Sequence, residues 1–193
     1  MSDRIYVVEA IADGAEGFPY DEILSLGVCS VDLDAGQFDS VFDAYICEEP
    51  KNIGKRKLDY AESKGLDTIQ LFDGLSLEEA AARFKETVRG QYVTSYDIRQ
   101  EFSKYLTNDP WDITLEAHIM PSIMMRQPVS LKCKRPEDEP DYIRKAYSRM
   151  FGRSDPACVG RDPRGALALA QMASQIMIEL RNRGKYRPEL FTA

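Results

Sequence analysis

Three apolar segments with the composition of β-strands open the chain before any helical pattern begins. The first, from Ile5 to Gly14, predicts a short buried strand that runs into a loop carrying acidic residues. A second strand is predicted between Glu22 and Asp32, and a third between Phe38 and Cys47. The sequence Asp34-Ala35-Gly36 between them predicts a hairpin turn. A chain that begins in this way builds its core on a sheet.

Helical patterns alternate with short strands in the next part of the chain. Ser76-Leu77-Glu78-Glu79 is a capping box, and apolar residues at helical spacing follow it, so a helix is predicted that ends at Gly90. A strand over Tyr92 to Thr94 and a helix over Ile98 to Leu106 come next, and Trp111 to Leu115 is interpreted as a further strand. This order of elements indicates an α/β protein.

Two regions are less regular, and two helices are predicted near the end of the chain. Glu48 to Leu71 is polar and is predicted to be irregular. His118 to Pro136 contains a methionine-rich apolar patch, which is interpreted as a core segment. Helices are predicted over Ile143 to Met150 and from about Gly165 to Asn182. Residues 183–193 are expected to form a loosely held tail.

Length and composition fit one globular domain over residues 1–193. No apolar run approaches the roughly 18 residues of a membrane span. The N-terminus also lacks the pattern of a signal peptide, so a cytoplasmic protein without membrane association is predicted. The four cysteines, which lack the spacing of a metal site, are expected to be reduced thiols, with those on the predicted strands buried. They are Cys29, Cys47, Cys133 and Cys158.

The opening strand and the order of elements resemble the DEDD (DnaQ-like) 3′-5′ exonucleases, which have the ribonuclease-H-like fold. In that family the first strand carries Asp-x-Glu, and both carboxylates bind catalytic metal. The matching positions here are Glu9 and Ile11. The family's second motif is an Asp beside an aromatic residue at the start of a helix, which Tyr96-Asp97 resembles. The resemblance therefore implies a mixed α/β sheet with flanking helices and places Asp97 at the second metal-binding position.

The third motif of the family is a His followed five residues later by an Asp that leads into an alanine-rich helix. The segment from Gly160 to Ala170 has this cadence, with Gly160 at the position of the general base and Gly165 at the position of the metal ligand. If the resemblance holds, Ile11 and Gly165 point into one pocket with Glu9 and Asp97. Divalent metals such as magnesium require oxygen ligands, so the resemblance implies a degenerate site and no cofactor is expected.

The predicted function is accordingly that of a pseudonuclease, which binds nucleic acid or another protein through the retained cleft. One alternative is a working magnesium- or manganese-dependent 3′-5′ exonuclease that uses Glu9, Asp97 and displaced acids such as Asp13 or Asp162. Another is a homo-oligomeric scaffold, such as a homodimer, assembled through the patch from Met120 to Met125.

Two basic clusters are candidates for contacts with single-stranded nucleic acid. The net charge of −7 argues against generic tight binding to a polyanion but allows a local basic patch. Phosphate contacts from such clusters would make binding sensitive to salt. His118, the one histidine, lies well before the third motif and is expected to have a structural or surface role. The first basic cluster consists of Lys51, Lys55, Arg56 and Lys57, and the second basic cluster consists of Lys132, Lys134 and Arg135.

Overall fold

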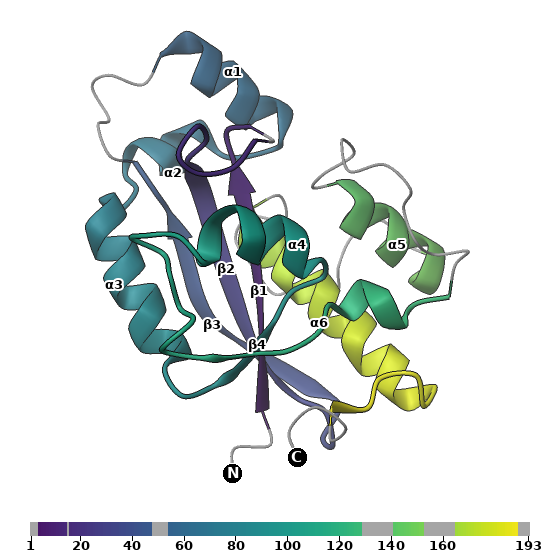
Figure 1. Cartoon of the computed structure of the whole chain (residues 1–193). Coiled ribbons are helices and arrows are strands. Elements are labelled where there is room, and N and C mark those ends of the chain that lie inside the picture. Colours follow the sequence, from purple (N-terminus) through teal and green to yellow (C-terminus); the bar gives the residue numbers. More distant parts are fainter. Residues whose placement is uncertain (1–3, 15, 48–53, 129–140, 153–164, 189–193) are drawn as a thin grey trace.

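A five-stranded mixed sheet forms the centre of the protein. The computed structural model describes residues 4–14, 16–47, 54–128, 141–152 and 165–188 (Figure 1). The strand order is β3-β2-β1-β4-β5. β2 pairs antiparallel with both β1 and β3, whereas β4 pairs parallel with both β1 and β5. The strands are β1 (Arg4–Ala12), β2 (Ile23–Asp32), β3 (Gln37–Tyr45), β4 (Tyr92–Thr94) and β5 (His118–Ile119).

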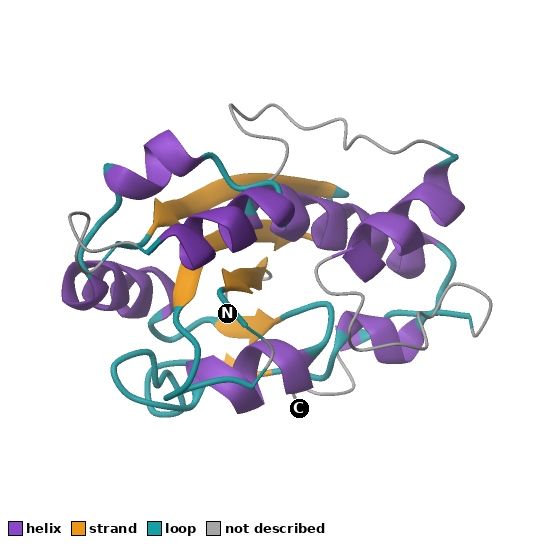
Figure 2. Ribbon diagram, turned by 90° about the horizontal axis from the view of Figure 1, so that it is seen from above, coloured by secondary structure: helices purple, strands orange, loops and turns teal. Residues whose placement is uncertain are grey.

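Six α-helices formed by the described residues flank this sheet (Figure 2). They are α1 (Lys55–Ser63), α2 (Thr68–Phe72), α3 (Leu77–Val88), α4 (Ile98–Glu101), α5 (Asp141–Phe151) and α6 (Ala166–Asn182). A π-helical turn, Phe102–Leu106, extends α4, and a 3₁₀ turn, Ile123–Arg126, follows β5. The predicted mixed sheet with flanking helices is thereby confirmed.

Successive residues of β1 point to opposite faces of the sheet, because side chains alternate along a strand. Ile5, Val7 and Ile11 belong to the core beneath α5 and α6, whereas Val8 belongs to the core beneath α3. The alternation places Glu9 on the same face as Val7 and Ile11. Both residues of the first motif therefore face α6.

Helix α6 begins directly on the middle of β2, where the residue is a glycine. A Cβ atom on Gly27 would lie 2.3 Å from both the Cα and the backbone nitrogen of Leu167. Gly27 is paired with Glu9 of β1 in the sheet. The absence of a side chain at Gly27 lets the first turn of α6 approach the sheet beside the first motif.

Several predicted elements are confirmed. The Ser76 hydroxyl accepts a hydrogen bond from the Glu79 backbone nitrogen at the start of α3, and Gly90, just after the helix, has a φ of +70°. The two terminal helices and the hairpin with Gly36 in its turn are also observed. Cys29 and Cys47 are buried thiols, as predicted.

Two other predictions were wrong. The region from Glu48 to Leu71 contains α1 and the start of α2, and Asp67 caps α2 by accepting hydrogen bonds from the Ile69 and Gln70 nitrogens. Trp111 to Leu115 is not a strand. Trp111 and Ile113 instead pack a loop into the core that includes α3, and the Ile113 backbone nitrogen donates to the Leu106 carbonyl, whereas Leu115 is exposed.

Tyr186 and the methionine patch are more buried than a loose tail or an assembly surface would be. Tyr186 is 2% exposed and belongs to the core, so the predicted loose tail is wrong at this residue. Met120 is buried and Met124 is packed against the core, whereas Met125 is 65% exposed. The methionine patch is mainly a core segment, as predicted.

No helix among the described residues combines the length and apolarity that crossing a membrane would need.

Candidate functional site

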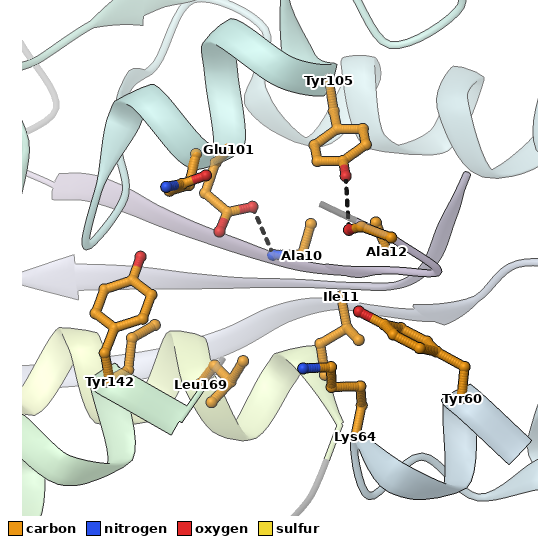
Figure 3. Close-up of a pocket in the computed structure, with 12 residues that line it drawn as sticks. Ala10, Ile11, Ala12, Tyr60, Lys64, Glu101, Tyr105, Tyr142 and Leu169 are labelled. Carbon is orange, nitrogen blue, oxygen red and sulfur yellow. Dashed lines mark hydrogen bonds between the residues drawn. The ribbon is translucent and has the colours of Figure 1, made fainter. Parts of the chain in front are cut away.

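A small pocket lies where β1 ends, between the layers that α4, α5 and α6 form around the strand (Figure 3). Its volume is about 40 Å³, which is room for about three water molecules. Twelve described residues from β1, its following loop and four helical segments line it. They are Ala10, Ile11, Ala12, Gly14, Tyr60, Lys64, Gln100, Glu101, Tyr105, Tyr142, Ile143 and Leu169.

Glu9 lies beside this pocket and is fully buried. Its Oε1 atom accepts a hydrogen bond of 2.6 Å from the backbone nitrogen of Tyr96. Tyr96 follows β4, so this bond ties the middle of β1 to the junction between β4 and α4. A buried carboxylate needs such a donor, because burial without a hydrogen bond is costly. Glu9 therefore anchors the backbone at the edge of the site.

Glu101, the last residue of α4, makes the reciprocal connection. Its Oε2 atom accepts a hydrogen bond of 3.0 Å from the backbone nitrogen of Ala10 (Figure 3). The side chain is buried and lines the pocket. Glu9 thus binds the backbone just before α4, and Glu101 binds the backbone of β1, the strand that carries Glu9. Sequence reasoning missed Glu101, although it lies one helical turn after Asp97.

Asp97 does not reach the pocket, which corrects the predicted convergence. It is the N-cap residue of α4, and its Oδ1 atom accepts a hydrogen bond of 3.1 Å from the backbone nitrogen of Arg99. Ser122 supports the same end of the helix, since its hydroxyl accepts from the Ile98 nitrogen. An N-cap side chain turns back onto its own helix, so the side chain that faces β1 comes one turn later, at Glu101.

In α6, as in α4, the residue that faces the pocket lies about one helical turn after the predicted one. Gly165 is the N-cap residue of that helix and is not among the lining residues. The next backbone nitrogen, that of Ala166, donates to the Ser25 hydroxyl of β2. Leu169, four residues after Gly165, lines the pocket together with Ile11. The predicted placement of Gly165 in the pocket is therefore wrong, and Leu169 occupies the facing position.

The residues of this pocket do not fit a pair of catalytic metal ions. Magnesium and manganese are held by oxygen ligands, chiefly carboxylates. Of the twelve lining residues, Glu101 alone is acidic. Ile11 and Leu169 are buried aliphatic side chains and have no lone pair to offer. Within the described parts of the chain, no three acidic, histidine or cysteine side chains are grouped as metal ligands. Gly160 and Asp162 lie outside the described residues.

Asp13, a candidate displaced acid, is part of an ion-pair network with α1. The ammonium of Lys57 lies 3.2 Å from Asp13 Oδ2 and also pairs with the Glu22 carboxylate. The Oδ1 atom of Asp13 accepts a hydrogen bond from the Glu22 nitrogen. The pairs join α1 to the loop between β1 and β2. Asp13 is accordingly engaged away from Glu9 and Glu101.

The first basic cluster is only in part available for phosphate contacts. Lys55 is exposed, but Lys57 is engaged by Asp13 and Glu22. Partial burial lowers the pKa of Lys57, but the hydrogen bond and charge of Glu22 and the charge of Asp13 outweigh it and raise the pKa above its ordinary value. The remaining candidates fall on residues, or in one case a side chain, outside the description. They are Lys51, Arg56, Lys132, Lys134 and Arg135.

The ion pairs of Lys57 predict a loss of stability in alkali. Because its pKa is raised on folding, their contribution is complete below the unfolded pKa of about 10.4 and disappears as pH rises through the folded value. The melting temperature of Lys57→Met should therefore be lower than that of the wild type at neutral pH. The difference between the two melting temperatures should narrow above about pH 10.4. Melting curves across this range provide the measurement. Lys55→Met is the matched control and should show no such gap; a gap for Lys57→Met that stays constant with pH contradicts the assignment.

His118 lies far from the pocket along the strands. It is exposed on β5, and its ring centroid is 5.2 Å from that of Tyr92. Tyr92 pairs with Ile5, near the opposite end of β1 from Ile11. The predicted surface role of His118 is confirmed.

Solved structures with a similar arrangement of elements include nucleases, although no family model and no curated protein matches the sequence. Cell-death related nuclease 4 is 12% identical with a TM-score of 0.62, and the match covers 94% of this chain and 64% of that one. E. coli exonuclease I in complex with a 5cy-dT13 oligonucleotide is 12% identical with a TM-score of 0.63, covering 97% of this chain and 42% of that one. A full-length 3′-exonuclease is 14% identical with a TM-score of 0.54. The chain spans less than two thirds of the first two, and identities this low show the fold alone.

Proposed function

We propose that this chain, which has the ribonuclease-H-like fold of the DEDD (DnaQ-like) 3′-5′ exonucleases, is a catalytically inactive pseudonuclease that acts as a binding module. The observation that carries the proposal is the presence of Ile11 and Leu169 in the pocket beside Glu101. Two facing positions that could supply carboxylates to metal are aliphatic. The site therefore lacks the ligands on which metal-dependent phosphodiester cleavage depends.

The two glutamates at the site, Glu9 and Glu101, have a structural role that does not depend on catalysis. Glu9 accepts from the Tyr96 nitrogen, and Glu101 accepts from the Ala10 nitrogen. Hydrogen bonds to charged groups are worth about 1.5–3 kcal/mol. These bonds hold β1 against the β4–α4 junction, so the shape of the cleft persists without metal. A stable cleft of this kind supports binding rather than turnover.

The charges around the cleft favour a protein over nucleic acid as the bound partner. The net charge is −7, and Lys57 of the first basic cluster is already paired with two carboxylates. An acidic surface repels the phosphate backbone at long range. Binding to an oligonucleotide, which the exonuclease I complex illustrates for that protein, is accordingly the less favoured function here.

The absence of cleavage is the direct test of this proposal. A 5′-labelled single-stranded DNA or RNA oligonucleotide should keep its full length when incubated with the purified protein and magnesium or manganese. The physical reason is that Ile11 and Leu169 cannot coordinate either ion. Products are resolved on a denaturing gel. Metal-dependent shortening that disappears in Glu101→Gln would establish activity at this pocket and overturn the proposal, whereas shortening unchanged by that substitution identifies a contaminating nuclease.

A further inference from the structure

A second, wider groove adjoins the pocket and opens at the surface. Its volume is about 830 Å³, and it lies between the β1–β2 loop and α1. Gly14 and Tyr60 line both the groove and the small pocket, so the two are adjacent. The groove is lined by Asp13, Gly14, Glu16, Tyr20, Asp21, Gly54, Lys57, Asp59 and Tyr60.

One exposed aromatic ring, that of Tyr20, lines this groove on a loop that hydrogen bonds hold to the rest of the structure. Tyr20 is 77% exposed, and the neighbouring Phe18 is 45% exposed. The Phe18 nitrogen donates to the Lys104 carbonyl, and the Asp21 carboxylate accepts from the Gly17 nitrogen within the loop. A ring presented on a loop that is already ordered binds at a low entropic cost. Tyr20 is thus a preorganised contact residue.

The charged residues that line the groove determine which chemical groups of a partner it can bind. Four carboxylates and one ammonium line the groove, and that ammonium, Lys57, is neutralised by its own ion pairs. Glu16 and Asp59 are exposed to solvent. Carboxylates beside tyrosine rings suit a guanidinium group, which stacks on an aromatic face and forms charge-assisted hydrogen bonds to carboxylates. Phosphates would meet like charge in the same place.

We propose that this groove binds an arginine-rich segment of a partner protein, with Tyr20 as the stacking surface and with Glu16 and Asp59 as the charge contacts. The inference rests on the proposed role as a binding module and names the partner class for the cleft. The segment lies across the β1–β2 loop and α1, and the neighbouring pocket is too small to admit more than the tip of a side chain.

The test uses labelled decapeptides as probes of the full chain. A fluorescein-labelled peptide of alternating arginine and glycine is titrated by fluorescence anisotropy, beside a glutamate–glycine peptide and a single-stranded dT oligonucleotide. Glu16→Gln/Asp59→Asn should weaken binding of the arginine peptide about tenfold, and Tyr20→Ala about threefold. The matched control Glu78→Gln/Asp73→Asn removes the same charges at exposed positions outside the groove and should weaken binding less than about twofold.

Each outcome of the titration either supports or overturns the inference. The inference is supported if the groove variants alone lose affinity for the arginine peptide while their melting temperatures equal that of the wild type. Equal loss in the control pair, binding of the oligonucleotide in preference to the arginine peptide, or no binding at all overturns it. The oligonucleotide is also inspected for shortening in manganese with each preparation. Shortening that is lost in Glu101→Gln overturns the noncatalytic function, whereas an intact oligonucleotide with no peptide binding overturns the arginine-segment inference alone.

Discussion

Gly27→Val is expected to lower the free energy of unfolding by about 3 kcal/mol, at the upper end of the usual cost of overpacking. A Cβ atom at this position would lie 2.3 Å from the Leu167 backbone, which cannot rotate away as a side chain can. Relief requires that α6 move off the sheet. Such a movement also displaces Leu169 from the pocket at the end of β1. The effect therefore reports on the contact that builds the site.

Urea denaturation of wild type and variant measures this loss. Gly54→Ala is the matched control, because a Cβ atom at Gly54 has no neighbour within 4 Å. Its free energy of unfolding should change by less than about 1 kcal/mol. If Gly27→Val unfolds at the same urea concentration as the wild type, α6 does not begin on β2 as described.

The elements with strong local patterns were predictable from the sequence. β1, β2 and β3 carry apolar runs separated by a turn, and α3 has both a capping side chain and a glycine stop. By contrast, α1 is largely polar, and its attachment depends on the buried Ala61 and on the ion pairs of Lys57. Contacts between distant segments cannot be read from the helical period alone, so this helix was missed.

The site was predictable in its first strand but not in its helices. Ile11 lines the pocket, as the Asp-x-Glu comparison predicted, whereas Glu9, which was predicted to face the same pocket, is not among the lining residues and binds the Tyr96 nitrogen. Asp97 and Gly165 were both placed one turn too early, since each is an N-cap and the residues facing β1 are Glu101 and Leu169. Which residue of a helix meets the sheet depends on where the helix starts and how it crosses the strands. The sequence does not contain that geometry.

Rebuilding carboxylates at the two aliphatic positions should create a metal site. Ile11→Glu/Leu169→Asp would add two acids to the pocket that holds Glu101. Without metal, the buried unpaired charges should cost about 3–5 kcal/mol, which is a large part of a typical domain's stability of about 5–15 kcal/mol. Metal that binds the folded state alone should restore about 2.7 kcal/mol at a hundredfold excess over its dissociation constant.

Two controls separate metal binding at the pocket from a general effect of polar substitution. Ile11→Gln/Leu169→Asn has nearly the same shape as the rebuilt variant but adds no charge, so manganese should leave it unchanged. Ile11→Glu/Gly165→Asp adds the same two acids but places the second at the N-cap of α6, outside the pocket lining. It should gain little from manganese. If the rebuilt variant is unfolded without metal, its folding is followed by circular dichroism as manganese is added.

The melting temperature of these variants and of the wild type, measured with and without manganese, tests most directly whether Ile11 and Leu169 abolish the metal site. A manganese-dependent rise is predicted for Ile11→Glu/Leu169→Asp, with none for the wild type or the uncharged variant. A comparable rise in the wild type would show that the native pocket holds the metal, and no rise in the rebuilt variant would show that positions 11 and 169 do not converge. Either result would contradict the account.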